Sequence, residues 1–125
     1  MAAQSVDRDS RFQRHLPLFV YGTLMRGERA HDILAPHVVR ASAAFLEGAS
    51  LLSLGRYPIA VIGPGSVYGE VLWLADEGYD AMLELLDRYE GPVYVRQAVR
   101  VRLAEGQKCT PAWAYLGIHA LEDDA

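Results

Sequence analysis

Residues 93–103 carry the pattern that most restricts the fold of this chain, an alternation of apolar and polar side chains. A period of two is typical of a strand that buries one face. The apolar positions are Val93, Val95, Val99, Val101 and Leu103, and Gln97 is the polar exception among them. The segment Glu105-Gly106-Gln107 then predicts a hairpin turn, and 109–116 predicts the returning strand. This strand places Trp113 and Tyr115 on one face and Ala112 and Ala114 on the other.

Much of the remaining chain also predicts strands. Residues 16–21 and 67–74 are strongly apolar, and 38–54 predicts one long strand or two short ones interrupted at Gly48. The apolar run 59–61 is flanked by the glycine- and proline-containing segments 55–58 and 62–65, which predict loops. Gly69 indicates a bulge or a close approach of the backbone.

Two helices are expected. The first covers 28–34 and ends before Pro36, and the second follows the strand at 67–74. The apolar side chains of the second recur every three or four residues, at Tyr79, Met82, Leu83, Leu86 and the flanking Tyr89. The acidic residues Asp80, Glu84 and Asp87 lie opposite, and Gly91 followed by Pro92 ends the helix. This helix should therefore pack one face inward.

The expected fold is α+β and mostly β. With 125 residues, of which 51% are hydrophobic, the chain has the size of one domain with an ample core. We expect a disordered leader over 1–15, a single domain over 16–117 and an acidic tail over 118–125. Because strands outnumber helices, a closed or nearly closed small barrel would protect the edges of the sheet.

The composition argues against several classes of protein. The longest apolar runs are far shorter than the ~18 residues that cross a bilayer, so a soluble, cytoplasmic protein is expected. The net charge of −4 argues against a nucleic-acid partner. The exception is a stripe of arginines on one face of the 93–103 strand, which we interpret as a solvated face: Arg96, Arg100 and Arg102.

Neither metal nor thiol chemistry is indicated. His31 and His37 are six residues apart, and no zinc-ligand spacing is found. Cys109 is the only cysteine, so an intrachain disulfide and a cysteine-based zinc cluster are excluded. A cysteine beside strand residues is more often a buried small apolar group than a nucleophile.

The first strand ends in a glycine turn that predicts a binding site. Leu18-Phe19-Val20 runs directly into Tyr21-Gly22-Thr23-Leu24, and polar, helix-compatible sequence follows. Glycine permits a sharp turn and leaves main-chain N–H groups open to a ligand. The turn therefore predicts a cradle for a small anion or a carbonyl oxygen.

Glu90 is the second candidate for chemistry. It lies in the last turn of the predicted helix, where the macrodipole and unpaired carbonyl groups disfavour a carboxylate. If Tyr89 and other neighbours also withdraw water, the pKa of the carboxyl would rise toward neutrality, and the group could both accept and donate a proton. From the local residues alone, a glutamate that points to solvent or pairs with a nearby arginine is the simpler interpretation.

Four separated blocks of this sequence together resemble the γ-glutamylcyclotransferase-like family, in the branch of the γ-glutamylamine cyclotransferases and AIG2-like proteins. The resemblance covers about 17–116 and rests on 19–27 (FVYGTLMRG), Tyr57-Pro58, 67–71 (VYGEV) and 86–91 (LDRYEG) with Tyr94. It implies a small mixed β-barrel with flanking helices, a pocket floored by the glycine turn, and a catalytic glutamate.

Carried over by position, the resemblance assigns the binding loop to Tyr21, Gly22, Thr23 and Leu24 and the catalytic acid and base to Glu90. Tyr115 corresponds to a pocket tyrosine on the last strand, although Tyr94 could supply a similar phenol. Tyr57 and Pro58 either shape the pocket wall or form a turn with a surface aromatic residue.

The implied reaction converts a γ-glutamyl amine, amino acid or peptide into 5-oxoproline and a free amine. The α-amine of such a substrate is tethered near its own γ-carbonyl, so no enzymic nucleophile, metal or cofactor is needed. The leaving amine stays open. The alternative is a non-catalytic module of the same fold that binds a small carboxylate ligand or a protein partner.

Overall fold

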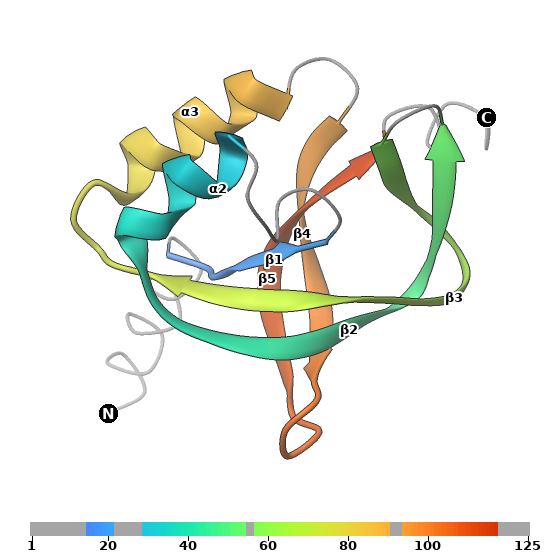
Figure 1. Ribbon diagram of the computed structural model, residues 1–125. Helices are drawn as coiled ribbons and strands as arrows, with labels where there is room; N and C mark the ends of the chain where they lie inside the picture. The colour runs from blue at the N-terminus through green and yellow to red at the C-terminus, as the bar shows by residue number, and fades with distance from the viewer. Residues whose placement is uncertain (1–14, 22–28, 55–56, 91–93, 118–125) are drawn as a thin grey trace, which may run out of the picture.

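The computed structural model describes residues 15–21, 29–54, 57–90 and 94–117 (Figure 1). In chain order the elements are β1 (Leu18–Val20), α2 (Arg29–Leu34), the 3-10 helix η2 (Ala35–His37), β2 (Val38–Leu54), β3 (Tyr57–Leu74), α3 (Tyr79–Glu90), β4 (Tyr94–Leu103) and β5 (Cys109–Gly117). The mostly-β prediction is confirmed, and the predicted strand at 16–21 is shorter than expected.

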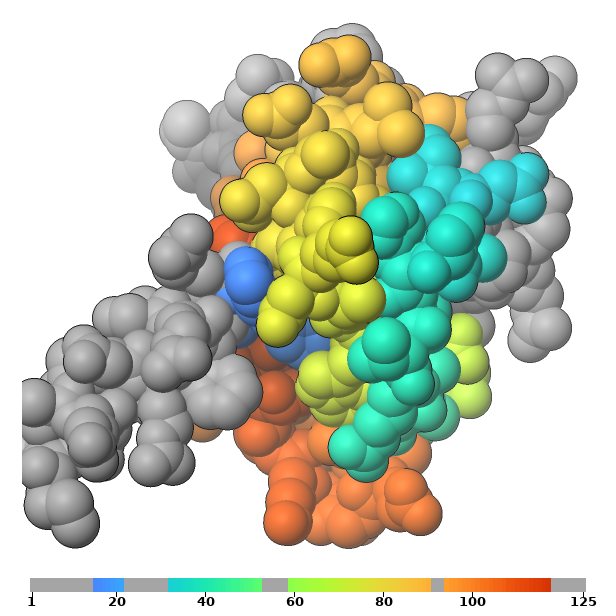
Figure 2. Space-filling view, turned by 90° about the vertical axis from the view of Figure 1, so that its left-hand side faces the viewer, coloured from blue at the N-terminus to red at the C-terminus, as the bar shows by residue number. Residues whose placement is uncertain are grey.

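The five strands form a closed barrel in the order β1-β3-β2-β4-β5. Three-residue β1 closes it, because Phe19 lies opposite Val71 of antiparallel β3 and opposite Ala114 of parallel β5. The predicted mixed barrel is therefore confirmed. The helices α2 and α3 lie side by side over one face, where they hide most of β1 (Figure 2).

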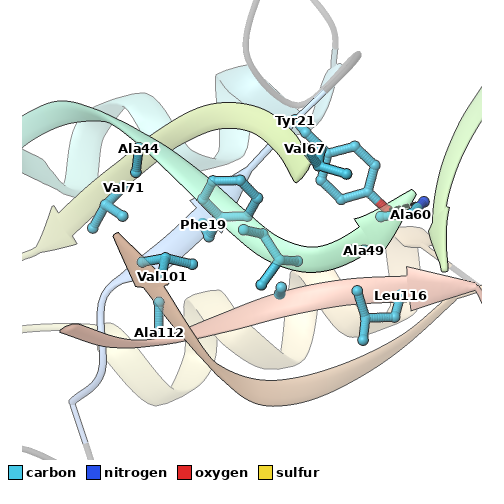
Figure 3. Close-up of a cluster of buried hydrophobic side chains, with 12 residues drawn as sticks. Phe19, Tyr21, Ala44, Ala49, Ala60, Val67, Val71, Val101, Ala112 and Leu116 are labelled. Atoms are coloured by element: carbon cyan, nitrogen blue, oxygen red, sulfur yellow. Dashed lines mark hydrogen bonds between the residues drawn. The ribbon is translucent and has the colours of Figure 1, made fainter. Parts of the chain in front are cut away.

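Two hydrophobic cores lie on opposite sides of β1 and β5, which are therefore buried on both faces. Phe19 and Tyr21 point into the barrel core, whereas Leu18 and Val20 point into the helix-side core under α3. Along β5, too, successive side chains point alternately into the barrel core and into the helix-side core. The small residues Ala112 and Ala114 of β5 line the barrel core, where Figure 3 shows Ala112. Trp113 and Tyr115 share the opposite face, as predicted, and this face packs in the helix-side core.

The loops predicted at 55–58 and 62–65 are wrong where the structure describes them, because β3 begins at Tyr57 and runs through 62–65. Glu47 of β2 pairs with Ser66 and Ala49 pairs with Ile62, so Gly48 alone opposes residues 63–65. This irregular section is a bulge, and Gly48 and Gly65 have φ of 76° and 125°. Pro64 is tolerated there because a bulged residue needs no ladder hydrogen bond from its nitrogen. Glycine and proline thus mark a bend within one long hairpin.

The close approach predicted at Gly69 is confirmed. A Cβ atom at this position would lie 2.2 Å from the carbonyl oxygen of Val20 and 2.9 Å from Cζ of Phe19. Only a residue without a side chain lets β1 pack this closely against β3.

Helix α3 confirms the predicted packing of Tyr79, Met82, Leu83 and Leu86, all of which are buried. The flanking Tyr89 is 45% exposed, so its assignment to the apolar face is wrong.

The outer face of β4 is less solvated than the arginine stripe predicted. Arg100 is exposed, but Arg96 and Arg102 are half-buried in ion pairs with Asp87 and Glu47. Helix α3 covers the Arg96 end of this face, and the curved β2 strand approaches Arg102.

Cys109 is exposed, so the expectation of a buried thiol is wrong. It lies at the first position of β5, opposite Arg102 and next to the hairpin turn.

In the part of the chain that the structure describes, no helix has both the length and the apolar character that a membrane crossing requires.

Candidate active site

Glu90 is the last residue of α3, and its side chain is half-buried. Burial raises the pKa of this carboxyl to about 7. Among the described residues no ion pair involves Glu90, so the interpretation as an arginine-paired surface glutamate is not supported. Tyr89 is itself 45% exposed, so it is not the residue that buries this carboxyl.

Two buried tyrosines lie near this carboxyl. Burial is the largest cause of the raised pKa values of Tyr21 and Tyr115, and the negative charge of Glu90 raises both further. Tyr94, the first residue of β4, is half-buried and adds to the raised pKa of Tyr21. The structure thus brings together Tyr21, Tyr94, Tyr115 and Glu90, four of the residues predicted from the sequence.

The hydroxyl group of Tyr21 holds three strands together. It donates to the backbone carbonyl of Tyr115 at 2.6 Å. It also accepts from the backbone N–H of Ala60 at 3.0 Å, and Figure 3 shows Tyr21 and Ala60 side by side. These bonds join the end of β1 to β5 and to the first part of β3. Because the phenolic proton already has an acceptor, Tyr21 is better suited to shape the site than to donate a proton.

The hydroxyl group of Tyr115 is also engaged. It donates to Oδ1 of Asp87 at 2.6 Å, and its ring is packed in the helix-side core. Contact between Tyr115 and a ligand would therefore involve the ring or a free lone pair of the oxygen.

The other predicted binding groups lie outside the described residues. These are Gly22, Thr23 and Leu24 and the side chains of Tyr57 and Pro58. Their roles stay predictions. The backbone of Tyr57 and Pro58 is part of β3, opposite Leu54 and Ser53 of β2.

Sequence reasoning missed the polar cluster beneath the site. Asp87 binds Arg96 through two hydrogen bonds, Nε to Oδ1 at 2.9 Å and Nη2 to Oδ2 at 3.0 Å. The sequence pattern had placed Asp87 on the outer face of the helix and Arg96 on a solvated face of a strand. The available signal was the spacing of Asp87 and Glu90, because residues three apart share one helix face.

The part of the chain that the structure describes contains no group of three or more histidine, cysteine, aspartate or glutamate side chains arranged to hold a metal ion.

Comparison with known proteins gives one consistent result. The family described as "Gamma-glutamyl cyclotransferase, AIG2-like" matches residues 18–124. A candidate gamma-glutamylcyclotransferase of Vibrio cholerae is 40% identical over 74 residues, which are 59% of this chain and 63% of that protein. A gamma-glutamylcyclotransferase family protein of Citrobacter rodentium is 32% identical over 99 residues, 79% of each chain.

Solved structures agree with this result. The crystal structure of an AIG2-like protein from Mus musculus superimposes with a TM-score of 0.63 at 26% identity, over 82% of this chain and 77% of that one. The match to the Vibrio cholerae protein spans less than two thirds of that relative's length, whereas the Citrobacter rodentium match spans most of it.

Proposed function

This chain belongs to the gamma-glutamyl cyclotransferase, AIG2-like family, and from that premise we propose that it releases 5-oxoproline and a free amine from a γ-glutamyl amine, amino acid or peptide. In this proposal Glu90 acts first as the general base and then as the general acid. The observation that carries the proposal is the half-buried carboxyl of Glu90, whose pKa of about 7 suits both roles near neutral pH.

The reaction proceeds within the substrate. The α-nitrogen forms a bond to the carbonyl carbon of the γ-glutamyl amide, and the bond from that carbonyl carbon to the leaving nitrogen breaks. The α-ammonium gives up two protons and the leaving nitrogen gains two, so the carboxylate of Glu90 ends in the form in which it began. Ring closure needs no enzymic nucleophile because the reacting atoms are already tethered.

The remaining groups would bind and shape the substrate. Main-chain N–H groups of the turn formed by Tyr21, Gly22, Thr23 and Leu24 would hold a carboxylate or the developing oxyanion. Tyr94 and Tyr115 would line the pocket beside Glu90, and Tyr57 and Pro58 would form its wall. No metal or organic cofactor takes part.

The test is a mass-spectrometric screen for 5-oxoproline release from a panel of γ-glutamyl amines, amino acids and peptides. The native protein is compared with Glu90→Gln and with Glu84→Gln, an exposed glutamate on the same helix. We expect Glu90→Gln to lose at least about a hundredfold in kcat, the typical contribution of a general base, and Glu84→Gln to match the native protein. Activity retained in Glu90→Gln would contradict the role of Glu90. No product from the folded native protein would favour a non-catalytic binding module.

A further inference from the structure

The carboxylate of Asp87 receives hydrogen bonds from three donor groups on two different strands. Tyr115 of β5 donates its hydroxyl to Oδ1, and Arg96 of β4 donates to both carboxylate oxygens. Arg96 and Tyr115 are direct partners across the β4–β5 pair, so the sheet presents their side chains together to α3. The Asp87 carboxylate of α3 is thus hydrogen-bonded by both members of one cross-strand pair.

Arg96 also packs against an aromatic side chain. The guanidinium group of Arg96 lies 4.4 Å from the centre of the Trp113 ring. The indole N–H of Trp113 donates to the hydroxyl of Tyr79, which donates to the carbonyl oxygen of Leu16. Because a guanidinium that is stacked on a ring and bound bidentately has few alternative conformations, Arg96 fixes the position of Asp87 firmly.

The position of this cluster connects it to Glu90. Asp87 lies one turn before Glu90 on α3, and Glu90 is the last helical residue. The ion pair and the hydrogen bond from Tyr115 connect this last turn to the barrel. The ion pair is half-buried, with side-chain exposures of 39% for Asp87 and 23% for Arg96. An arginine–carboxylate pair with two parallel hydrogen bonds fixes orientation as well as distance, so it holds the last turn of α3 in one position on the barrel.

The pKa values of the Asp87 and Glu90 carboxyl groups are shifted in opposite directions. Burial alone would raise the pKa of Asp87, but the hydrogen bonds from Arg96 and Tyr115 and the charge of Arg96 outweigh it and lower that pKa. The pKa of Glu90, one turn away, is instead raised. One carboxyl group therefore stays ionised while the other titrates near neutral pH, a division typical of acid–base sites.

We propose that Asp87 and Arg96 are positioning residues that hold the Glu90 carboxyl group at the reacting centre and cancel each other's charge beside it. The inference rests on the proposed function of Glu90. The charge of Glu90 acts on Tyr21 and on Tyr115 of β5, and Tyr94 of β4 acts on the same Tyr21. Asp87 precedes Glu90 by three residues on α3 and is bound to Arg96 of β4.

The test compares the pH dependence of kcat and KM in the variants Asp87→Asn, Arg96→Gln and Arg96→Lys and in the exposed control Arg100→Gln. Asp87→Asn leaves the cation of Arg96 uncompensated, so the acid limb of the profile should move to lower pH. Arg96→Gln leaves the anion of Asp87 uncompensated, so the same limb should move to higher pH. Both variants should lose about ten- to a hundredfold in kcat with little change in KM.

Three further variants separate the effect of charge from the effect of geometry. Arg96→Lys keeps the charge but loses the two-pronged geometry, so it should keep the native midpoint and still lose kcat. Asp87→Asn/Arg96→Gln should return the midpoint toward the native value, and Arg100→Gln should behave like the native protein. Midpoints that move in the same direction, or an unchanged kcat in all variants, would overturn the proposal.

A second measurement separates this proposal from the proposed reaction. The carbon-13 shift of the Glu90 carboxyl group is followed by NMR over pH 4 to 9 in the native protein, Asp87→Asn and Arg96→Gln. Opposite displacements of the Glu90 midpoint would support the charge cancellation even if no substrate is found. An unmoved Glu90 midpoint in folded variants would overturn it even if the native protein is active.

Discussion

A carboxyl group with a pKa of about 7 is half ionised at neutral pH, which makes Glu90 the residue through which pH should act on this protein. Only the carboxylate can take a proton from the α-ammonium of a substrate. We therefore expect kcat/KM to rise tenfold per pH unit below about 7 and to level off above it. The measurement is the initial rate of 5-oxoproline release from pH 5 to 9. A limb centred near the ordinary glutamate pKa of 4.5 would assign the dependence to another group.

The same raised pKa affects stability. The folded state holds the Glu90 proton more tightly than the unfolded state, so between pH 4.5 and about 7 folding takes up protons and stability falls as pH rises. Because glutamine does not ionise, Glu90→Gln removes this fall in stability with rising pH. Allowing for solvent screening of a half-buried group, we expect the variant to exceed the native protein by about 1–2 kcal/mol at pH 8 and to differ little at pH 4.

Urea unfolding at both pH values checks this expectation, with Glu84→Gln as the control that should show no such difference. Equal stabilities of Glu90→Gln and the native protein at pH 8 would mean that the carboxyl is not desolvated in solution.

Single residues were predictable to the extent that their cause was local. The place of Glu90 at a helix end indicated a raised pKa only if its neighbours also withdrew water, and an exposed or arginine-paired glutamate was the simpler interpretation. Burial of the carboxyl is what raises its pKa. The partners of Asp87 are 9 and 28 residues away, at Arg96 and Tyr115. Their meeting depends on how α3 is set across two strands, which no spacing within the sequence specifies.

At the level of elements, the crossing of β1 and β3 depends on Gly69. The Cβ atom in Gly69→Ala would meet a backbone oxygen at 2.2 Å, and a backbone atom cannot move aside as a side chain tip can. We expect a loss of about 2–4 kcal/mol in the free energy of unfolding, since overpacking and a broken strand contact combine. Gly63→Ala is the matched control, because its nearest contact would be the Ser50 hydroxyl at 3.3 Å.

Urea denaturation of both glycine variants gives the comparison. If Gly69→Ala is as stable as Gly63→Ala, the two strands do not approach as closely in solution as described here.

Element type was easier to predict than element ends. Helix α3 has a clear apolar period, and four of the side chains predicted for its inward face are buried: Tyr79, Met82, Leu83 and Leu86. The sequence predicted several short strands in place of the long β2–β3 hairpin, because its glycines and Pro64 are typical of loops. The same residue types also occur in bulges. Pairing with a partner strand distinguishes the two, and the pairing is a property of the folded sheet.

At the level of the whole molecule, Tyr21 joins three strands through one hydroxyl group. Tyr21→Phe would leave the carbonyl of Tyr115 and the N–H of Ala60 without this partner, so we expect a loss of about 1–3 kcal/mol. The exposed Tyr68→Phe is the control. Hydrogen exchange of the Ala60 amide should accelerate in Tyr21→Phe before the amides of α3 are affected. Unchanged protection of this amide would show that the hydroxyl group does not hold the strands together.

The barrel as a whole could be inferred from the excess of strands and the need to protect their edges, together with the family resemblance. The strand order could not. Alternation tells which face of a strand is buried but not which strand lies beside it, and β1 is buried on both faces by elements that lie far from it along the chain.

The three residues of β1 also determine when the barrel can close during translation, because β1 pairs with two strands that are synthesised at different times. Leu18 gains its partner Leu72 midway through synthesis, but its other partner, Trp113, is added 41 residues later. At about 5–20 residues per second, that interval lasts roughly 2–8 seconds. Throughout it the nascent sheet has an open edge of apolar residues that can pair with another chain. Ribosomes that stall between these two points should therefore yield the most aggregation-prone fragments of this protein.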